Sequence, residues 1–477
     1  MGLKKNITYS TLLTLSTYLV PLLVFPYISR ILGPEGIGAI DAVEYVINYA
    51  IICSMMGLTT LGIREIARNQ NNPEQLNRTF TDLFSLNVLS TLTIFILLVC
   101  CVFTIPEFTQ RKSFFFIGLI KLLANLFWIE WFFKGMEQFK YITIRSLVFR
   151  GIFVLSVFLF VNHSSDSLLY YSFWVGLTVA NAICNWNYRR RFASLQFRTV
   201  NIKRFFKPFI LLGLFALLSA IYTQLNVTYL SFVADDEQVG YYTTSIRLYT
   251  VLIALFSTIT GVMIPRVSVL MQERKSEEMR RLVHRTFILL FCFAFPVVIF
   301  MEVYAPDIIS IFAGSHFLPA VVPMRVVMLL VFIIGSEQIF ILQLLIPAQK
   351  EKAMLYCVSF GCLSCILINI LFTHKLLCLG SALAWVGAEI AVLISSSYFV
   401  KKYLMIQFPL HLFLRVLTYS LPLAGIAILI ACCIETPLLR LALAGLIFAP
   451  YAFIMADKLL VLGLTEKTIG LFKKNHC

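Results

Sequence analysis

Ionisable side chains inside long apolar stretches are the residues of this sequence that could do chemistry. The cations are Arg30, Lys121, Arg150 and Arg247, and the acids are Asp41, Glu44, Glu130, Glu337 and Glu389. Charged groups are costly within a membrane and normally face a cavity or a partner. A buried guanidinium or ammonium could hold a phosphate, and a buried carboxylate could bind a proton or a sodium ion. The pattern therefore predicts anion binding and ion coupling, with no catalytic set.

Arg247 is the sharpest candidate for binding an anion. It lies seven residues beyond Gly240, where its apolar stretch begins, which is on the order of 10 Å deep at 1.5 Å per residue. Asp41 and Glu44 are three residues apart and so share one helical face. A plain salt bridge between Arg247 and these two acids, which would lock one conformation, remains an alternative.

The other polar candidates are predicted with two roles each. Lys121 and Arg150 could contact substrate or pair helices, and Glu337 and Glu389 could carry a proton or make an interhelical hydrogen bond. Gln224 and Asn226 could line a sugar-binding cavity or bond a neighbouring helix.

The stretch WIEWFFKGMEQFKY, residues 128–141, ends one apolar run. We expect Trp128 and Trp131 to form an aromatic belt at the membrane interface. Glu130 then lies about one turn inside, where it could take part in ion coupling. The favoured interpretation of the stretch is a cytoplasmic gate or elbow between two helices, and contact with the head of the substrate is the alternative.

The elements that position these residues are membrane-spanning helices. Sixty per cent of the 477 residues are apolar, 13% are charged and the mean hydropathy is +0.87, whereas a soluble domain carries about 25% charged residues. Stretches of about 20 apolar residues can cross a hydrocarbon core as helices, the structure that satisfies every backbone group there. We predict fourteen such helices: 11–32, 38–60, 79–103, 113–133, 142–161, 168–187, 209–232, 240–262, 286–304, 321–346, 354–372, 378–399, 410–433 and 438–457.

The distribution of basic residues predicts the orientation. If the N-terminus is cytoplasmic, the inside segments hold 30 of the 39 Lys and Arg residues. This asymmetry predicts that both termini face the cytoplasm, and it accounts for the net charge of +15 without a nucleic-acid partner. Most of the twelve cysteines lie in apolar stretches, where cysteine behaves as a small hydrophobe, so we expect no metal site.

An internal duplication predicts the domain organisation. A shift of 202 residues aligns LGPEGIGAI (32–40) with ADDEQVGYY (234–242), which places Gly38 on Gly240. Each copy has six predicted spans, so the repeats are parallel, an arrangement found in transporters. We predict an N-terminal six-helix lobe (1–188), a cytoplasmic linker with an interfacial helix (189–208), a C-terminal six-helix lobe (209–400), and two additional helices with a cytoplasmic tail (401–477).

Four motifs resemble those of the polysaccharide repeat-unit flippases (Wzx type) of the multidrug/oligosaccharidyl-lipid/polysaccharide exporter superfamily. They are LGPEGIGAID with GIREIA, WFFKGMEQFKYI, EQVGYYTTSIRLY, and IPRVS, in the family's order over residues 5–400. Lys134 replaces the Gln of the family's WFFQG-type motif. The resemblance implies two lobes around a central cavity and alternating access. It also implies movement of an undecaprenyl-pyrophosphate-linked oligosaccharide from the cytoplasmic to the periplasmic leaflet of a bacterial inner membrane.

No cofactor is expected, and no GxxxxGK[ST] motif for a nucleotide occurs. Transport would then draw on H+ or Na+, or on the membrane potential, with membrane lipids as surroundings. Polysaccharide polymerase and chain-length machinery stay open as partners. A drug/cation antiporter of the same superfamily, a lipid II flippase and a membrane polysaccharide polymerase or ligase remain the alternatives.

Overall fold

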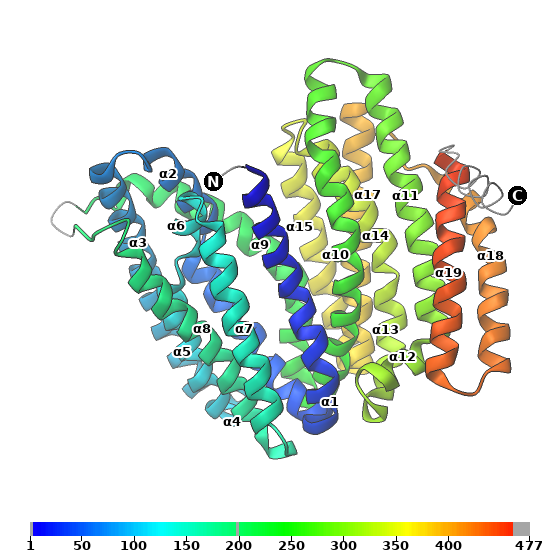
Figure 1. Ribbon diagram of the computed structural model, residues 1–477, viewed down its shortest axis with the longest axis horizontal. Coiled ribbons are helices and arrows are strands. Elements are labelled where there is room, and N and C mark those ends of the chain that lie inside the picture. Colours follow the sequence, from blue (N-terminus) through cyan, green and yellow to red (C-terminus); the bar gives the residue numbers. More distant parts are fainter. Residues whose placement is uncertain (1–2, 197–199, 461–477) are drawn as a thin grey trace, which may run out of the picture. The chain divides into compact units, whose positions relative to one another are not determined.

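The computed structural model describes residues 3–196 and 200–460, and every regular element in them is a helix (Figure 1). Twelve helices of this part are long and apolar enough to cross a membrane. The predicted all-α, multi-pass membrane protein is therefore confirmed. The predicted span 11–32 and most of the span 38–60 lie in α1, which a break at Gly33 divides, and the count of fourteen crossings stays a prediction.

The contacts between Cα atoms divide the chain into unit 1 (Met1–Thr243) and unit 2 (Thr244–Cys477). This division falls within α10, and the predicted lobe boundaries remain a prediction. The elements of unit 1 are α1 (Leu3–Met55), α2 (Leu58–Asn69), α3 (Pro73–Thr104), α4 (Pro106–Gln110), α5 (Lys112–Trp128), α6 (Glu130–Gly135), α7 (Phe139–Phe160), η1 (Ser164–Asp166), α8 (Ser167–Arg189), α9 (Lys203–Val233) and the start of α10 (Asp236–Gln272).

A break at Gly33 separates the two halves of α1. Gly33 has φ 68° and ψ −179°, a conformation that costs glycine little because it has no Cβ. Pro34 follows and begins the second half, where its missing N–H removes no helical bond. The two halves correspond to the two predicted spans, and they pack against α3, α5, α7 and α9.

A cluster of buried aromatic side chains holds one end of unit 1 together. Trp131 in α6 is 2% exposed and stacks on Phe80 of α3, with ring centroids 5.7 Å apart. Gly62 of α2 makes room for that indole, since a Cβ there would lie 2.4 Å from a ring carbon. The predicted interfacial belt is wrong for Trp131, because neighbouring helices bury it completely.

The predicted interfacial helix of the linker stays a prediction, since residues 203–208 are helical as the start of α9 and residues 197–199 lie outside the described part. Residues 190–196 and 200–202 form turns and irregular chain. The physical reason is local: backbone N–H groups of Ser194 and Asn201 donate to side chains of α3, to Asn77 Oδ1 at 2.8 Å and to Asp82 Oδ1 at 2.7 Å. These side chains replace the helical hydrogen bonds.

Unit 2 is also a bundle of long helices. After the rest of α10 it contains α11 (Ser276–Val303), α12 (Ala305–Phe312), η3 (Ser315–Ala320), α13 (Val321–Met328), α14 (Leu330–Glu337), η4 (Gln338–Leu345), α15 (Glu351–Ile368), η5 (Asn369–Thr373), α16 (His374–Leu376), α17 (Cys378–Leu404), α18 (Leu410–Cys433) and α19 (Pro437–Leu460). The two predicted C-terminal helices are α18 and α19, and both pack on α11. The predicted tail, 461–477, lies outside the described residues.

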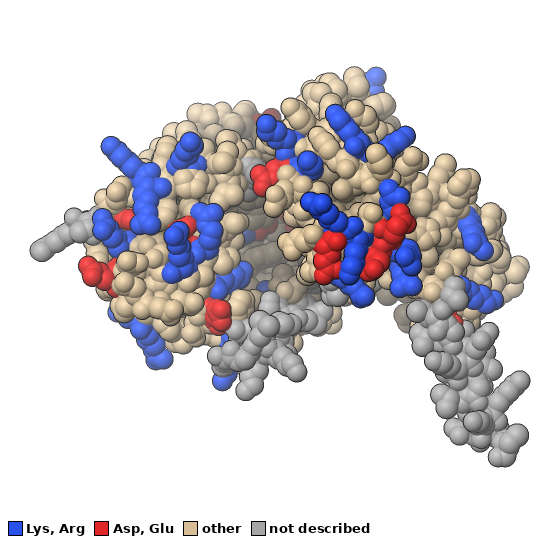
Figure 2. Space-filling view, turned by 90° about the horizontal axis from the view of Figure 1, so that it is seen from above, with Lys and Arg blue, Asp and Glu red and all other residues tan. Residues whose placement is uncertain are grey.

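Basic side chains of unit 1, among them Arg64, Arg68, Lys134 and Lys140, lie at one end of its helices. Figure 2 is a view from above, in which blue Lys and Arg side chains are spread over the visible surface. In unit 1 the end carries α2, the α6–α7 turn and the linker, which pack together on α3. The predicted cytoplasmic linker therefore lies beside these two segments.

Candidate functional site

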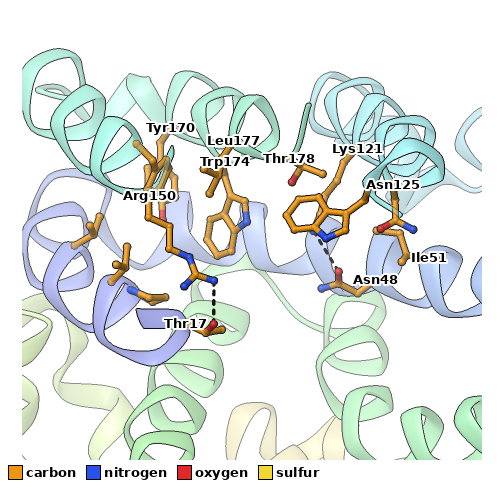
Figure 3. A pocket seen from close by; sticks show the side chains of 15 residues that line it. Thr17, Asn48, Ile51, Lys121, Asn125, Arg150, Tyr170, Trp174, Leu177 and Thr178 are labelled. Carbon is orange, nitrogen blue, oxygen red and sulfur yellow. Dashed lines mark hydrogen bonds between the residues drawn. The ribbon is translucent and has the colours of Figure 1, made fainter. Parts of the chain in front are cut away.

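Unit 1 contains a cavity of about 390 Å³ between α1, α5, α7 and α8 (Figure 3). Two of the predicted cationic residues, Lys121 and Arg150, line it from opposite helices. Its walls also carry hydroxyl, amide and aromatic groups. The lining residues are Thr17, Val20, Pro21, Val24, Asn48, Ile51, Lys121, Asn125, Trp128, Arg150, Phe153, Tyr170, Trp174, Leu177 and Thr178.

Helical spacing explains why these side chains share one cavity. Lys121, Asn125 and Trp128 are four and three residues apart on α5, so they lie on one face of that helix. Tyr170, Trp174 and Thr178 repeat every four residues along α8 in the same way. The two faces meet because α5 and α8 pack against each other along their length.

Arg150 brings a positive charge whose described partners are all neutral. Its guanidinium donates to Thr17 Oγ1 at 2.9 Å, to the Leu13 carbonyl at 3.2 Å and to Ser16 Oγ, all on the first half of α1. Among the described residues, no carboxylate lies within salt-bridge distance of this side chain. The charge is therefore available to an anion in the cavity, into which Figure 3 shows the side chain projecting.

Lys121 has a different environment, because it forms an ion pair with Glu44 of α1. Its Nζ also donates to Asn48 Oδ1 at 3.2 Å. Glu44 accepts two further hydrogen bonds, from Tyr171 Oη at 3.1 Å and from Asn48 Nδ2 at 3.3 Å. Lys121 and Glu44 are 8% and 6% exposed, so this ion pair is buried at the wall of the cavity.

Glu130 lies in a separate polar cluster and does not line the cavity. Its carboxylate pairs with Arg145 of α7 at 3.1 Å and with Lys134 at 3.3 Å. Arg145 also donates to Asn185 Oδ1, and Asn185 donates to the Trp128 carbonyl, which the break of the helix at Ile129 leaves free. These contacts fit the structural elbow that was favoured for this stretch.

The remaining candidates of unit 1 are not brought to the cavity. Arg30 is exposed near the end of the first half of α1 and donates to the Pro26 carbonyl, while Asp41 is buried. Gln224 and Asn226 belong to α9, where Asn226 is fully buried and Gln224 is partly buried. None of the four lines the cavity between α1, α5, α7 and α8.

Two of the predicted acids lie near each other in unit 2. Glu337 at the end of α14 and Glu389 in α17 are 6% and 2% exposed, and the two helices pack against each other. Two carboxylates buried in one place are strongly unfavourable, so we expect a proton on one of them. Trp385 Nε1 donates to Glu389 at 2.9 Å. Arg247 is half-buried in α10, and its predicted role stays a prediction.

Sequence reasoning missed several residues of these sites. Asn48, Asn125 and Trp174 are not among the predicted candidates, although Asn48 lies four residues after Glu44 and Asn125 four residues after Lys121, a usable signal. Arg145 is not among them either, and only the turn between α6 and α7 places it against Glu130.

Comparisons with known proteins agree with this architecture. A family model described as polysaccharide biosynthesis protein matches residues 3–271. A protein named "Putative O-antigen transporter" from Escherichia coli (strain K12) is 30% identical over 167 residues, which cover 35% of this chain and 40% of that protein. A protein of the same name from Shigella dysenteriae is 25% identical over 359 residues, 74% of this chain and 88% of that protein.

A solved structure of the lipid II flippase MurJ, in an inward closed conformation, is similar in fold. It superposes with a TM-score of 0.78 over 95% of this chain and 98% of that one, at 15% identity. At this identity the likeness establishes the fold alone.

Proposed function

The chain belongs to the polysaccharide biosynthesis protein family, and on that premise we propose that it is a flippase for lipid-linked oligosaccharide repeat units. Two relatives named as O-antigen transporters and a MurJ-like fold support this function. It is a transporter rather than an enzyme. Its cargo combines a polar sugar head, a phosphate-containing link and an apolar tail that can remain in the lipid.

The observation that carries the proposal is the Arg150 guanidinium in the cavity of unit 1. A cation without a carboxylate partner is unfavourable between apolar helices, so its presence there indicates a functional role. An anionic group of the cargo supplies the missing negative charge, and the planar guanidinium can donate two hydrogen bonds to a phosphate. Lys121, on the wall of the same cavity, supplies the second cation.

The other lining groups suit the sugar next to that anionic group. Trp174 and Tyr170 offer flat apolar faces, and Asn125 and Thr178 offer hydrogen-bonding groups beside them. A cavity of about 390 Å³ is at the small end of the ~300–1,000 Å³ range of ligand pockets. It therefore receives the charged link and the adjoining sugar, and the rest of the oligosaccharide stays outside.

The finer features of the proposal are those that the resemblance to the polysaccharide repeat-unit flippases and the distribution of charge imply. The lipid carrier is undecaprenyl pyrophosphate, the membrane is the bacterial inner membrane, and both termini are cytoplasmic. The cargo moves from the cytoplasmic to the periplasmic leaflet, coupled to H+ or Na+ or to the membrane potential. The basic side chains of α2, the α6–α7 turn and the linker, at one end of unit 1, support this orientation.

Deletion of the gene in its own host tests the function. We expect the deletion strain to lose surface polysaccharide and to accumulate lipid-linked repeat units in the cytoplasmic leaflet, with both defects reversed by a plasmid copy. Accessibility of the repeat units to an added glycosidase in inverted vesicles distinguishes the leaflets. Surface polysaccharide that is unchanged by the deletion would contradict the proposal.

A further inference from the structure

The Lys121 ammonium occupies a position that is built for a cation. Its Nζ lies against two oxygen atoms of α1, Glu44 Oε1 and Asn48 Oδ1, and a third oxygen, Tyr171 Oη, bonds the same carboxylate. The ammonium is tethered to α5, however, so the cation can leave these oxygen atoms without leaving the protein. The same side chain lines the cavity in which we place the anionic group of the cargo.

Glu44 retains other hydrogen bonds when Lys121 moves away from it. It keeps hydrogen bonds from Tyr171 at 3.1 Å and from Asn48 at 3.3 Å when the ammonium moves away. These neutral donors do not balance its charge, and a buried carboxylate without a counter-charge is strongly unfavourable. When Lys121 moves to bind an anion in the cavity, another cation must therefore bind at Glu44 to balance the charge of its carboxylate.

We propose that Glu44, Asn48 and Tyr171 form a binding site for a monovalent cation, H+ or Na+, which fills when Lys121 turns to the anionic group of the cargo. This inference rests on the proposed function and adds the position of the coupling ion to it. The charge balance is simple: one cation enters at Glu44 for each Lys121 that is transferred to the cargo. The ion pair between Lys121 and Glu44 is then the resting state of an exchange.

The charged and titratable groups around this site belong to four helices. Lys121 comes from α5 and Tyr171 from α8, and Asp41 lies one turn before Glu44 on α1. Arg150 of α7 lines the same cavity, and its described hydrogen-bond partners are neutral. Arg150 therefore contacts the anion whether or not a cation is bound at Glu44, whereas Lys121 contacts it only when one is.

Linkage makes the proposal measurable. If a cation at Glu44 releases Lys121 for the anion, the cation must raise the anion affinity, and the anion must raise the cation affinity by the same factor. The expected factor is roughly 5- to 150-fold, the usual range of such coupling. An anion site with no linked cation site would show no such dependence.

Binding of inorganic pyrophosphate to the purified full-length protein in nanodiscs tests this inference. Fluorescence reports binding because Trp128 and Trp174 line the cavity. Affinity is measured across Na+ concentrations, with choline holding the ionic strength constant, and across pH at fixed Na+. We expect the affinity to rise 5- to 150-fold with Na+, with falling pH, or with both, and the effective variable identifies the cation.

Two variants separate the mechanism from a general effect of charge. Glu44→Gln removes the partner of Lys121, so pyrophosphate should bind as tightly as to cation-saturated wild type, and without dependence on Na+ or pH. Glu35→Gln, the same change at an exposed position of the same helix, should keep the wild-type dependence. Thermal unfolding of each variant verifies that it is folded.

Each alternative result has a clear meaning. Wild type that binds pyrophosphate equally at every Na+ concentration and pH would overturn the cation site and leave the proposed function standing. Glu44→Gln that retains the dependence would overturn it as well. A wild-type protein that binds no pyrophosphate under any of these conditions would overturn both the cation site and the assignment of the cavity to an anionic cargo.

Discussion

Gly38 of α1 and Gly240 of α10 lie in direct backbone contact within unit 1. A Cβ on Gly38 would stand 1.7 Å from the carbonyl oxygen of Asp236, and a Cβ on Gly240 would stand 2.2 Å from that of Pro34. These are the two glycines that a shift of 202 residues aligns in the sequence. Equivalent segments of the predicted repeat thus cross each other at a point where only glycine fits.

Gly38→Ala should therefore be strongly destabilising. The added methyl group meets backbone atoms, which cannot move aside as a flexible side chain would, so the two segments must separate. Overpacking in a core costs typically about 1–3 kcal/mol, and a clash with backbone belongs at or above the upper end of that range. Thermal unfolding of the purified protein should show a clearly lower midpoint than wild type.

Gly151→Ala provides the matched control for that substitution. Gly151 lies inside α7 and has no heavy atom within 4 Å of an added Cβ. Alanine should be neutral there or stabilise by about 0.5–1 kcal/mol, because it loses less conformational freedom on folding. Equal loss of stability in both variants would show that the packing at Gly38 is not the cause.

The cluster around Glu130 should behave as a coupled structural unit. Arg145→Gln removes the ion-pair partner of a largely buried carboxylate, and removing one partner of a buried pair costs about 3–5 kcal/mol. A double-mutant cycle with Glu130→Gln measures the coupling, which should be at least about 1 kcal/mol for groups in contact. Lys134→Gln should cost far less, since the Lys134 side chain is 33% exposed.

Additive effects of the Arg145 and Glu130 substitutions would contradict this account. They would mean that the two side chains act on stability through separate neighbours. The hydrogen bonds of Arg145 to Asn185 would then be the relevant contacts.

The carboxyl pair of unit 2 should tolerate the loss of one charge. Two buried carboxyl groups near each other are expected to share one proton, so Glu337→Gln places a neutral donor in the position of a neutral group. We expect its unfolding midpoint to stay close to that of wild type, whereas Glu337→Ala leaves a cavity and an unpaired Glu389 and should cost about 2–5 kcal/mol. Infrared spectroscopy should show a protonated-carboxyl band in wild type that Glu337→Gln weakens.

An unchanged infrared band in Glu337→Gln would contradict the shared proton. Likewise, a Gln variant as unstable as the Ala variant would show that the pair is ionised and held by charge.

The fold was largely predictable from the sequence because the hydrocarbon core restricts the choice to helices. Long apolar runs predicted the helical, multi-pass architecture, and the alignment of LGPEGIGAI with ADDEQVGYY singled out the glycines that meet. The irregular part of the linker was not predictable from its own residues. Asn77 and Asp82 of α3 supply hydrogen bonds to Ser194 and Asn201 from more than a hundred residues away, and residues 203–208 of the predicted linker are helical.

The sequence predicted which charged residues line the candidate site, but it did not predict which of them form ion pairs. Lys121 and Arg150 were named because charge is rare inside apolar stretches, and both line one cavity. That Glu44 pairs with Lys121 depends on the packing of α1 against α5, which no local spacing encodes. For the same reason the contact between Glu337 and Glu389 could not be read from two residues in separate helices.

The most direct test of the central claim is surface polysaccharide in the deletion host complemented with Arg150→Gln, at membrane levels matched to wild type. Losing a charged hydrogen bond of about 1.5–3 kcal/mol predicts at least a roughly tenfold fall in transport. Arg64→Gln, an exposed arginine of the same unit outside the cavity, should restore wild-type levels. Full activity of Arg150→Gln would contradict the assignment of this cavity to the anionic group of the cargo.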